Sequence, residues 1–307
     1  MDEIILNQLM TAEYSGRATR PKPDREHLYR YTHKEFLEAG LAEIFHENTK
    51  LTKNTNRIDD RTTSMFLTDE TMKYATHRIN PDYKGREVVE LHEPNKSLET
   101  DVADAIRQRR SKRSYSGDGI SRQKLSNLLY YSCGITHTQS ADMGSESSEM
   151  TPEFRAYPSA GGLYPVEPYI AVLNSSGSLD RGLYYYVPKD HKLRKLGGEN
   201  VCSRVLAVFG EGSGITVDKA AACLMFTAAF WRSKAKYGNR GYRFTLQESG
   251  HIMQNVQIAA TSLGLHSVPV SSVDEQAMED LLDVNGVEES IVYTGLVGVS
   301  AEVEDDE

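Results

Sequence analysis

A long helical pattern runs from Tyr242 to Leu263 and is the longest regular segment of the chain. Apolar residues recur along it at helical spacing, and Gly264 marks its end. β-type runs occur at residues 168–173, 182–187, 221–230 and 290–299. The first two runs are separated by a short turn, which predicts neighbouring antiparallel strands. Helices mixed with mainly antiparallel strands predict an α+β fold, in which helices flank a central sheet.

The regularity of the sequence changes near residue 93. Before that point the chain is polar and weakly patterned, apart from an extended arm at 14–25 and a helix expected from Thr32. From there on we expect one helix capped by Ser97 and a second capped by Ser121. The sequence therefore predicts an accessory region, residues 1–93, and a main domain, residues 94–307.

The charge balance excludes some classes of partner. The 307 residues include 35 Lys and Arg and 44 Asp and Glu, a formal net charge of −9. This argues against a nucleic-acid-binding protein and against binding to an anionic membrane. The N-terminus lacks the basic start and apolar core of a signal peptide, and the three cysteines are far apart, as in proteins with reduced thiols. We expect a cytoplasmic protein.

A turn of small residues precedes the first β-type run. Pro158 fixes one backbone angle, Ser159 offers a hydroxyl group, and Ala160, Gly161 and Gly162 keep the main chain free of bulk. A flat ring could lie directly against such a backbone. An ordinary loop before a strand would explain these residues equally well, so the rest of the chain must decide.

A basic cluster lies where the first helix of the main domain gives way to a loop. It consists of Arg109, Arg110, Ser111 and Arg113. Guanidinium groups beside a hydroxyl group suit a phosphate, although most charge runs are simply solvated.

Two pairs of polar residues have alternative explanations. Lys236 and Tyr237 lie between the last buried run and the long helix, where a solvated surface lysine would be the ordinary reading. Glu248 and His251 are three residues apart on the long helix, a spacing that can bind a metal ion. Such a pair without further ligands is more often a structural hydrogen bond, so we predict no metal.

Taken together, these motifs resemble the flavin site of the nitroreductase superfamily, and more narrowly its SagB-type (McbC-like) dehydrogenases. That branch contains the azoline oxidases of thiazole/oxazole-modified peptide biosynthesis. Gly162 and Tyr164 stand where ordinary nitroreductases tend to carry Asn and Gln, as in the SagB-type branch. The resemblance covers residues 97–299, and its motifs lie at 109–115, 157–167, 236–238, 241–244 and 248–251.

The resemblance implies a role for each motif. The basic cluster would hold the phosphate and ribityl end of FMN, and the turn at 158–162 would lie against its isoalloxazine ring. Val270, Ser271 and Ser272 would aim backbone N–H groups at the ring from a helix N-terminus, opened by a capping box at 272–275. Nitroreductases often add a basic residue after the last strand, whereas here Ser300 is followed by no basic side chain.

In the SagB-type branch that these motifs resemble, the Lys-Tyr pair is catalytic. Lys236 would be the base and Tyr237 its hydrogen-bond partner or proton relay, although the two roles could be exchanged. Burial, or a neighbouring cation such as Arg232 or Arg240, would lower the pKa of the lysine enough for it to act as a base.

The resemblance implies an FMN-dependent dehydrogenase that oxidises thiazoline or oxazoline rings of a ribosomally made peptide. It would act as a homodimer, beside a cyclodehydratase. One alternative is an NAD(P)H-dependent nitro- or quinone reductase. Another is a non-catalytic flavin-binding scaffold subunit of a cyclodehydratase complex.

Overall fold

The computed structural model describes residues 41–51, 63–77, 83–98, 100–138, 153–177, 179–210 and 214–301. It separates into two units, residues 1–64 and 65–307. The described part of the first unit contains helix α3 (Leu41–Asn48). The arm predicted at 14–25 and the start of the helix predicted from Thr32 lie outside the described residues.

The second unit contains a sheet of seven strands in the order β1-β6-β5-β4-β7-β9-β8. Every neighbouring pair of these strands is antiparallel. The strands are β1 (Val88–Glu90), β4 (Val166–Val172), β5 (Gly182–Val187), β6 (Lys192–Gly197), β7 (Ala222–Ala229), β8 (Leu265–Val270) and β9 (Glu289–Val299). A separate small sheet pairs β2 (Ile135–Thr138) with β3 (Glu153–Arg155).

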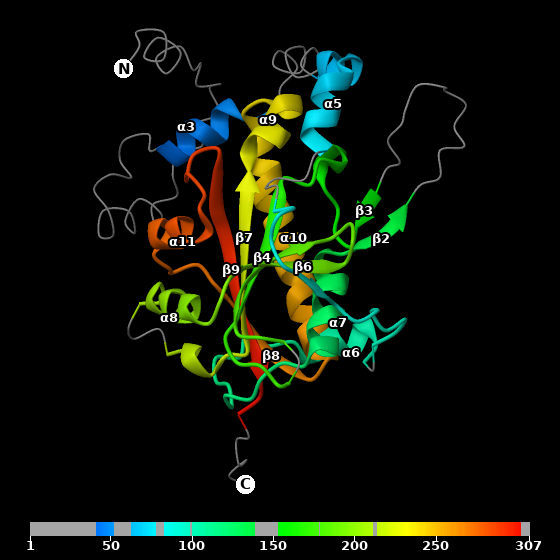
Figure 1. Cartoon of the computed structure of the whole chain (residues 1–307). Helices are drawn as coiled ribbons and strands as arrows, with labels where there is room; N and C mark the ends of the chain where they lie inside the picture. The colour runs from blue at the N-terminus through cyan, green and yellow to red at the C-terminus, as the bar shows by residue number, and fades with distance from the viewer. Residues whose placement is uncertain are drawn as a thin grey trace. The chain divides into compact units, whose positions relative to one another are not determined.

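Helices cover both faces of the large sheet (Figure 1). One apolar cluster joins the sheet to α7 (Arg122–Cys133) and α10 (Arg240–Ser262), and another joins it to α8 (Asn200–Ala207) and α11 (Glu275–Leu282). All residues of β4 and β7 are buried, because both strands are covered on both faces. The predicted α+β fold, with a mainly antiparallel sheet between helices, is confirmed.

Two predicted helix starts are wrong. Helix α6 (Val102–Gln108) begins after Asp101, not Ser97, because the Asp101 carboxylate accepts a hydrogen bond from the Asp104 backbone N–H at 2.9 Å. Helix α11 likewise begins after Asp274 instead of Ser272, because Asp274 accepts from the Ala277 N–H at 3.0 Å. In both cases a carboxylate nearer the helix takes the capping role.

Other predicted boundaries agree with the structure. Ser121 caps α7, and α10 ends at Ser262, just before Gly264 at φ 66°. The division near residue 93 stays a prediction, although β1 precedes it in sequence and forms an edge strand of the large sheet. Within the described ranges no helix has the length and apolar content needed to cross a membrane.

Candidate functional site

The small-residue turn and the residues after it, 158–164, form what we call the shelf. A single 3-10 turn spans Ala160–Gly162, and Gly161 and Gly162 adopt φ angles of 67° and 68°. This left-handed region is open to glycine and costly for residues with a β-carbon. Tyr164 is also left-handed, at φ 45°, so the shelf is a strained turn held by its surroundings.

The buried carboxyl group of Glu248 is hydrogen-bonded to the shelf and to Val166, the first residue of β4. The Ser159 hydroxyl donates to Glu248 Oε2 at 2.5 Å and accepts from the Tyr164 backbone N–H at 2.9 Å. The other carboxyl oxygen of Glu248 accepts from the Val166 N–H at 3.4 Å. The hydroxyl hydrogen of Ser159 is therefore engaged within the protein, and the backbone of the shelf is the surface left for a ligand.

Lys236 and Tyr237 meet the shelf from helix α9 (Phe230–Tyr237). A β-carbon built on Gly161 would lie 2.5 Å from Tyr237 Oη and 2.7 Å from Lys236 Nζ. The two side-chain tips thus converge on Gly161, the first of the two glycines of the shelf. A β-carbon built on Gly162 would have no atom within 4 Å, so that part of the backbone faces open space.

Burial shifts the pKa values of the converging pair in opposite directions. It lowers the pKa of Lys236 and raises that of Tyr237. The lysine amine is therefore easier to deprotonate, while the tyrosine stays a proton donor. Neighbouring cations, which we expected to help, play no part in the shift at Lys236, because burial alone causes it.

Arg232 has a structural role instead. Its side chain is 2% exposed and forms an ion pair with the buried Glu167 at 2.7 Å. It also donates to the Tyr164 carbonyl oxygen at 3.0 Å. This buried guanidinium therefore ties the helix that carries Lys236 and Tyr237 to the end of the shelf.

The basic cluster lies at the β8 edge of the sheet. Ser111 forms a parallel bridge with Ser267, whose carbonyl accepts from the Lys112 N–H at 3.0 Å. Arg109 is half-buried, and Ser111 and Arg113 are exposed. Arg110 is exposed too, and its guanidinium donates to the Arg107 and Arg109 carbonyls, both at 2.8 Å, at the end of α6. The Arg110 guanidinium group is therefore partly satisfied within the protein, whereas the Arg113 side chain is exposed to solvent.

Val270, Ser271 and Ser272 do not form a helix N-terminus, so that expectation is wrong. Val270 ends β8, and the two serines are exposed in the connection to α11. The N–H of Asp274, the actual cap, donates to the Val208 carbonyl at 2.9 Å. The backbone N–H groups of these three residues therefore lie at the C-terminal end of the edge strand β8 and not at the start of a helix.

The shelf and the basic cluster lie at opposite ends of the sheet, whereas Val270 is linked through Thr294 and Met225 to Tyr169, midway along β4. The shelf leads into Val166, whereas Ser267, beside the basic cluster, is linked through Val297 and Ala222 to Val172. These two residues of β4 are about 20 Å apart at ~3.3 Å per residue. Figure 1 shows α9 near one end of the sheet and α6 near the other.

The end of β9 returns to the basic cluster. Ser300 pairs with Tyr115, and the Ser116 N–H donates to the Val299 carbonyl at 3.1 Å. A further basic side chain near this cluster is that of His266, whose Nδ1 lies 3.2 Å from the Ser114 carbonyl oxygen. Sequence reasoning had no means to single out this histidine, because only strand register brings it here.

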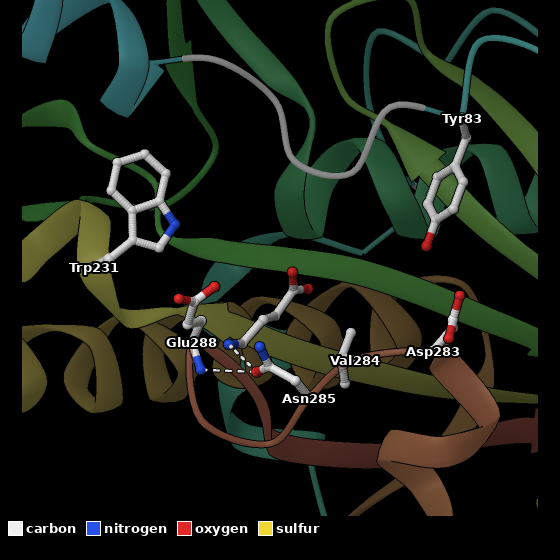
Figure 2. Close-up of a pocket in the computed structure, with 7 residues that line it drawn as sticks. Tyr83, Trp231, Asp283, Val284, Asn285 and Glu288 are labelled. Atoms are coloured by element: carbon white, nitrogen blue, oxygen red, sulfur yellow. Dashed lines mark hydrogen bonds between the residues drawn. The ribbon is translucent and has the colours of Figure 1, made fainter.

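A separate pocket of about 210 Å³ is lined in part by Trp231, at the start of α9, and by none of the predicted site residues (Figure 2). Its lining is Tyr83, Trp231, Asp283, Val284, Asn285, Glu288 and Glu289. Glu289 accepts from the Thr227 hydroxyl at 2.5 Å, and Asn285 accepts from the backbone of its own loop. These polar groups therefore have structural partners.

Glu248 and His251 do not act as a pair. Glu248 accepts its hydrogen bond from Ser159 and not from His251, which is exposed. Across the described residues no group of three or more His, Cys, Asp and Glu side chains is placed to hold a metal ion.

Glu248 makes a prediction about stability. Burial raises its pKa to about 7 from 4.5, against the opposing hydrogen bond from Ser159. The folded state thus binds the proton more tightly than the unfolded state, so stability falls as the pH rises from ~4.5 through ~7. We expect the free energy of unfolding, measured with urea, to fall by ~2.5 kcal/mol more between pH 5 and pH 8 in the native protein than in Glu248→Gln. The exposed Glu275→Gln is the control, and equal pH dependence in all three proteins would contradict the assignment.

Comparison with known proteins gives consistent matches. A family model described as "Nitroreductase family" matches residues 106–299. Protein MJ1384 of Methanocaldococcus jannaschii, whose name suggests a nitroreductase, is 30% identical over 186 residues, 61% of this chain and 86% of that protein. The Microcin B17-processing protein McbC of Escherichia coli is 31% identical over 114 residues, 36% of this chain and 42% of McbC.

A solved structure has the same fold. A chain of the E. coli microcin synthetase McbBCD complex with truncated pro-MccB17 bound matches with a TM-score of 0.53 and 19% identity. The match covers 86% of this chain and 99% of that chain.

Proposed function

Since the chain belongs to the nitroreductase family, in its McbC-like group, we propose that it is an FMN-dependent azoline dehydrogenase. The family is one of flavin oxidoreductases, which sets the general activity. The substrate in this proposal is a thiazoline or oxazoline ring in a ribosomally made peptide, and the product is the corresponding thiazole or oxazole.

The described residues fit a flavin. The backbone at Gly162 faces open space, as a flat ring resting on the shelf requires. Arg109 and Arg113 supply guanidinium groups for a phosphate, with the exposed hydroxyl of Ser111 between them. A full site would need both groups of residues, which one chain holds at opposite ends of its sheet.

The convergence of Lys236 and Tyr237 on Gly161 is the observation that carries this proposal. Bound FMN would supply the acceptor for a hydride, so aromatising one ring also releases one proton. Lys236, with its lowered pKa, takes this proton, and Tyr237 stays protonated and donates a hydrogen bond. The test is mass spectrometry of an azoline-containing peptide incubated with the FMN-loaded protein. Loss of two hydrogens per ring supports the proposal, and an unchanged mass contradicts it.

Arg113 and Arg109 should hold the phosphate of FMN. Replacing either by alanine is expected to weaken FMN binding by ~10- to 100-fold, the value of a charge-assisted hydrogen bond. Binding of riboflavin, which lacks the phosphate, should change little. Fluorescence titration with both flavins measures the difference, and Arg107→Ala, an exposed arginine outside the proposed set, is the control. Equal losses for FMN and riboflavin would rule out a phosphate role.

A homodimer would bring the two groups of cofactor residues together, the shelf of one chain facing the basic cluster of the other. Apolar side chains that such an interface would cover lie exposed on α6 and on the first turns of α10. They are Val102, Ile106, Tyr242 and Leu246. Burying apolar area of this kind favours association.

Disrupting that surface should separate the subunits. Ile106→Glu places a charge where the side chain is now 53% exposed and apolar. We expect a monomer by sedimentation, together with loss of FMN binding. Gln108→Glu adds the same charge to an exposed position at the end of α6 and should stay dimeric. If Ile106→Glu remained dimeric and kept FMN, this surface would not be the interface.

A peptide substrate suggests a partner that makes the rings. We therefore propose association with a cyclodehydratase; the match to a chain of the McbBCD complex, at 19% identity, shows the fold alone. Copurification with a cyclodehydratase encoded nearby would support this partnership.

Two alternatives have their own tests. MJ1384 favours an NAD(P)H-dependent nitro- or quinone reductase, for which NADPH should bleach the flavin and a nitroaromatic should be turned over. A non-catalytic scaffold subunit predicts that Lys236→Ala and Tyr237→Ala leave peptide processing intact.

A further inference from the structure

Glu248 is an ionisable side chain that contacts the shelf and has almost no exposure to solvent. Its side chain is 2% exposed, yet it belongs to none of the roles assigned above to FMN or the peptide. Its two oxygens reach both ends of one segment, Ser159 at the start of the shelf and Val166 at the start of β4.

We propose that Glu248 is a positioning residue: its carboxyl group fixes Ser159, and through Ser159 the turn that faces Lys236 and Tyr237. This inference rests on the proposed function, since it concerns the geometry of the same site. Ser159 is the intermediate because its hydroxyl group donates to Glu248 and accepts from Tyr164 N–H. The left-handed glycines between Ser159 and Tyr164 give the turn no rigidity of their own.

The charge of Glu248 should matter because charge-assisted hydrogen bonds are the stronger ones. The groups that act on it are Arg155 of β3, which favours the ionised form, and Glu167 of β4, which opposes it. Tyr157 and Tyr164 also interact with it: burial raises the pKa of both tyrosines, and the charge of Glu248 adds to the rise. With a pKa of about 7, the carboxyl group changes charge near neutral pH, so the shelf should be held most firmly above that pH.

The first experiment uses the protein without added flavin and measures amide hydrogen exchange residue by residue at one pH. Glu248→Ala should speed exchange at the Tyr164 and Val166 amides by at least ~10-fold, since both lose their tether. Ser159→Ala should do so at Tyr164 and leave Val166 unchanged. Gln247→Ala, the exposed neighbour on α10, is the control and should match the native protein. Native exchange at both amides in Glu248→Ala, or in Ser159→Ala if the former does not fold, would overturn the proposal.

The second experiment measures the FMN dissociation constant from pH 5 to pH 9. The native protein should bind several-fold more tightly above pH 7, and Glu248→Gln should bind at every pH as the native protein does at low pH. If Glu248→Gln kept the native midpoint, another group would control the transition and Glu248 would not. Failure of the native protein to bind FMN would refute the proposed function, whereas the exchange result would still decide the role of Glu248.

Discussion

Replacing Lys236 by alanine is expected to slow azoline oxidation by ~10²- to 10⁴-fold while leaving FMN bound, the usual loss on removing a general base. The expectation rests on the position of Nζ against Gly161 and on the lowered pKa of the amine. The oxidation rate should fall less in Tyr237→Phe, because this change removes one hydrogen-bonding hydroxyl group and keeps the aromatic ring. Single-turnover rates with FMN-loaded protein measure both effects.

The matched control for Lys236 is Lys234. It lies two residues earlier on α9, is exposed, and should tolerate alanine without a change in rate. Lys236→Arg adds a second control, because arginine keeps the charge and cannot act as a base at neutral pH. Full activity in Lys236→Ala would exclude the assigned chemistry and favour the scaffold alternative.

Gly161→Ala is expected to abolish most turnover through collision with the catalytic pair. Its new methyl group would lie 2.5 Å from Tyr237 Oη and 2.7 Å from Lys236 Nζ, so both tips must move away. The left-handed φ of 67° adds backbone strain of ~1 kcal/mol or more. We expect a fall in kcat of ~10²-fold or more, because small misplacements of catalytic groups cost this much.

Gly162→Ala separates the two causes. Its φ of 68° gives the same strain, but its methyl group meets no protein atom within 4 Å. Unfolding experiments should therefore show similar losses of stability in both variants. FMN affinity should fall mainly in Gly162→Ala, where the methyl group would enter the space proposed for the ring, and kcat mainly in Gly161→Ala. Equal effects of both variants on kcat and on affinity would contradict the geometry.

The sequence predicted the elements that carry strong local signals. The four β-type runs became β4, β5, β7 and β9, and the long helical pattern became α10. Weaker elements, such as β8 and β1, were missed because their pairing depends on strands distant in sequence. The two wrong helix caps show the limit of motif spacing where several capping residues compete.

The site was predictable in its parts and not in its assembly. Short motifs identified the shelf, the basic cluster and the Lys-Tyr pair, because each is contiguous in sequence. The bond between Ser159 and Glu248 joins residues 89 positions apart, and Arg232 reaches Tyr164 across 68. Such contacts follow from the packing of α9 and α10 against the shelf, which no local pattern encodes.

The most direct test of the central claim is an anaerobic single-turnover experiment. FMN-loaded protein is mixed with one equivalent of a thiazoline-containing peptide, and flavin colour and peptide mass are followed together. The proposal predicts that the yellow colour bleaches at the same rate as the peptide loses two hydrogens. Both rates should be much lower in Lys236→Ala. A flavin that stays yellow with an unchanged peptide, yet is bleached by NADPH, would contradict it.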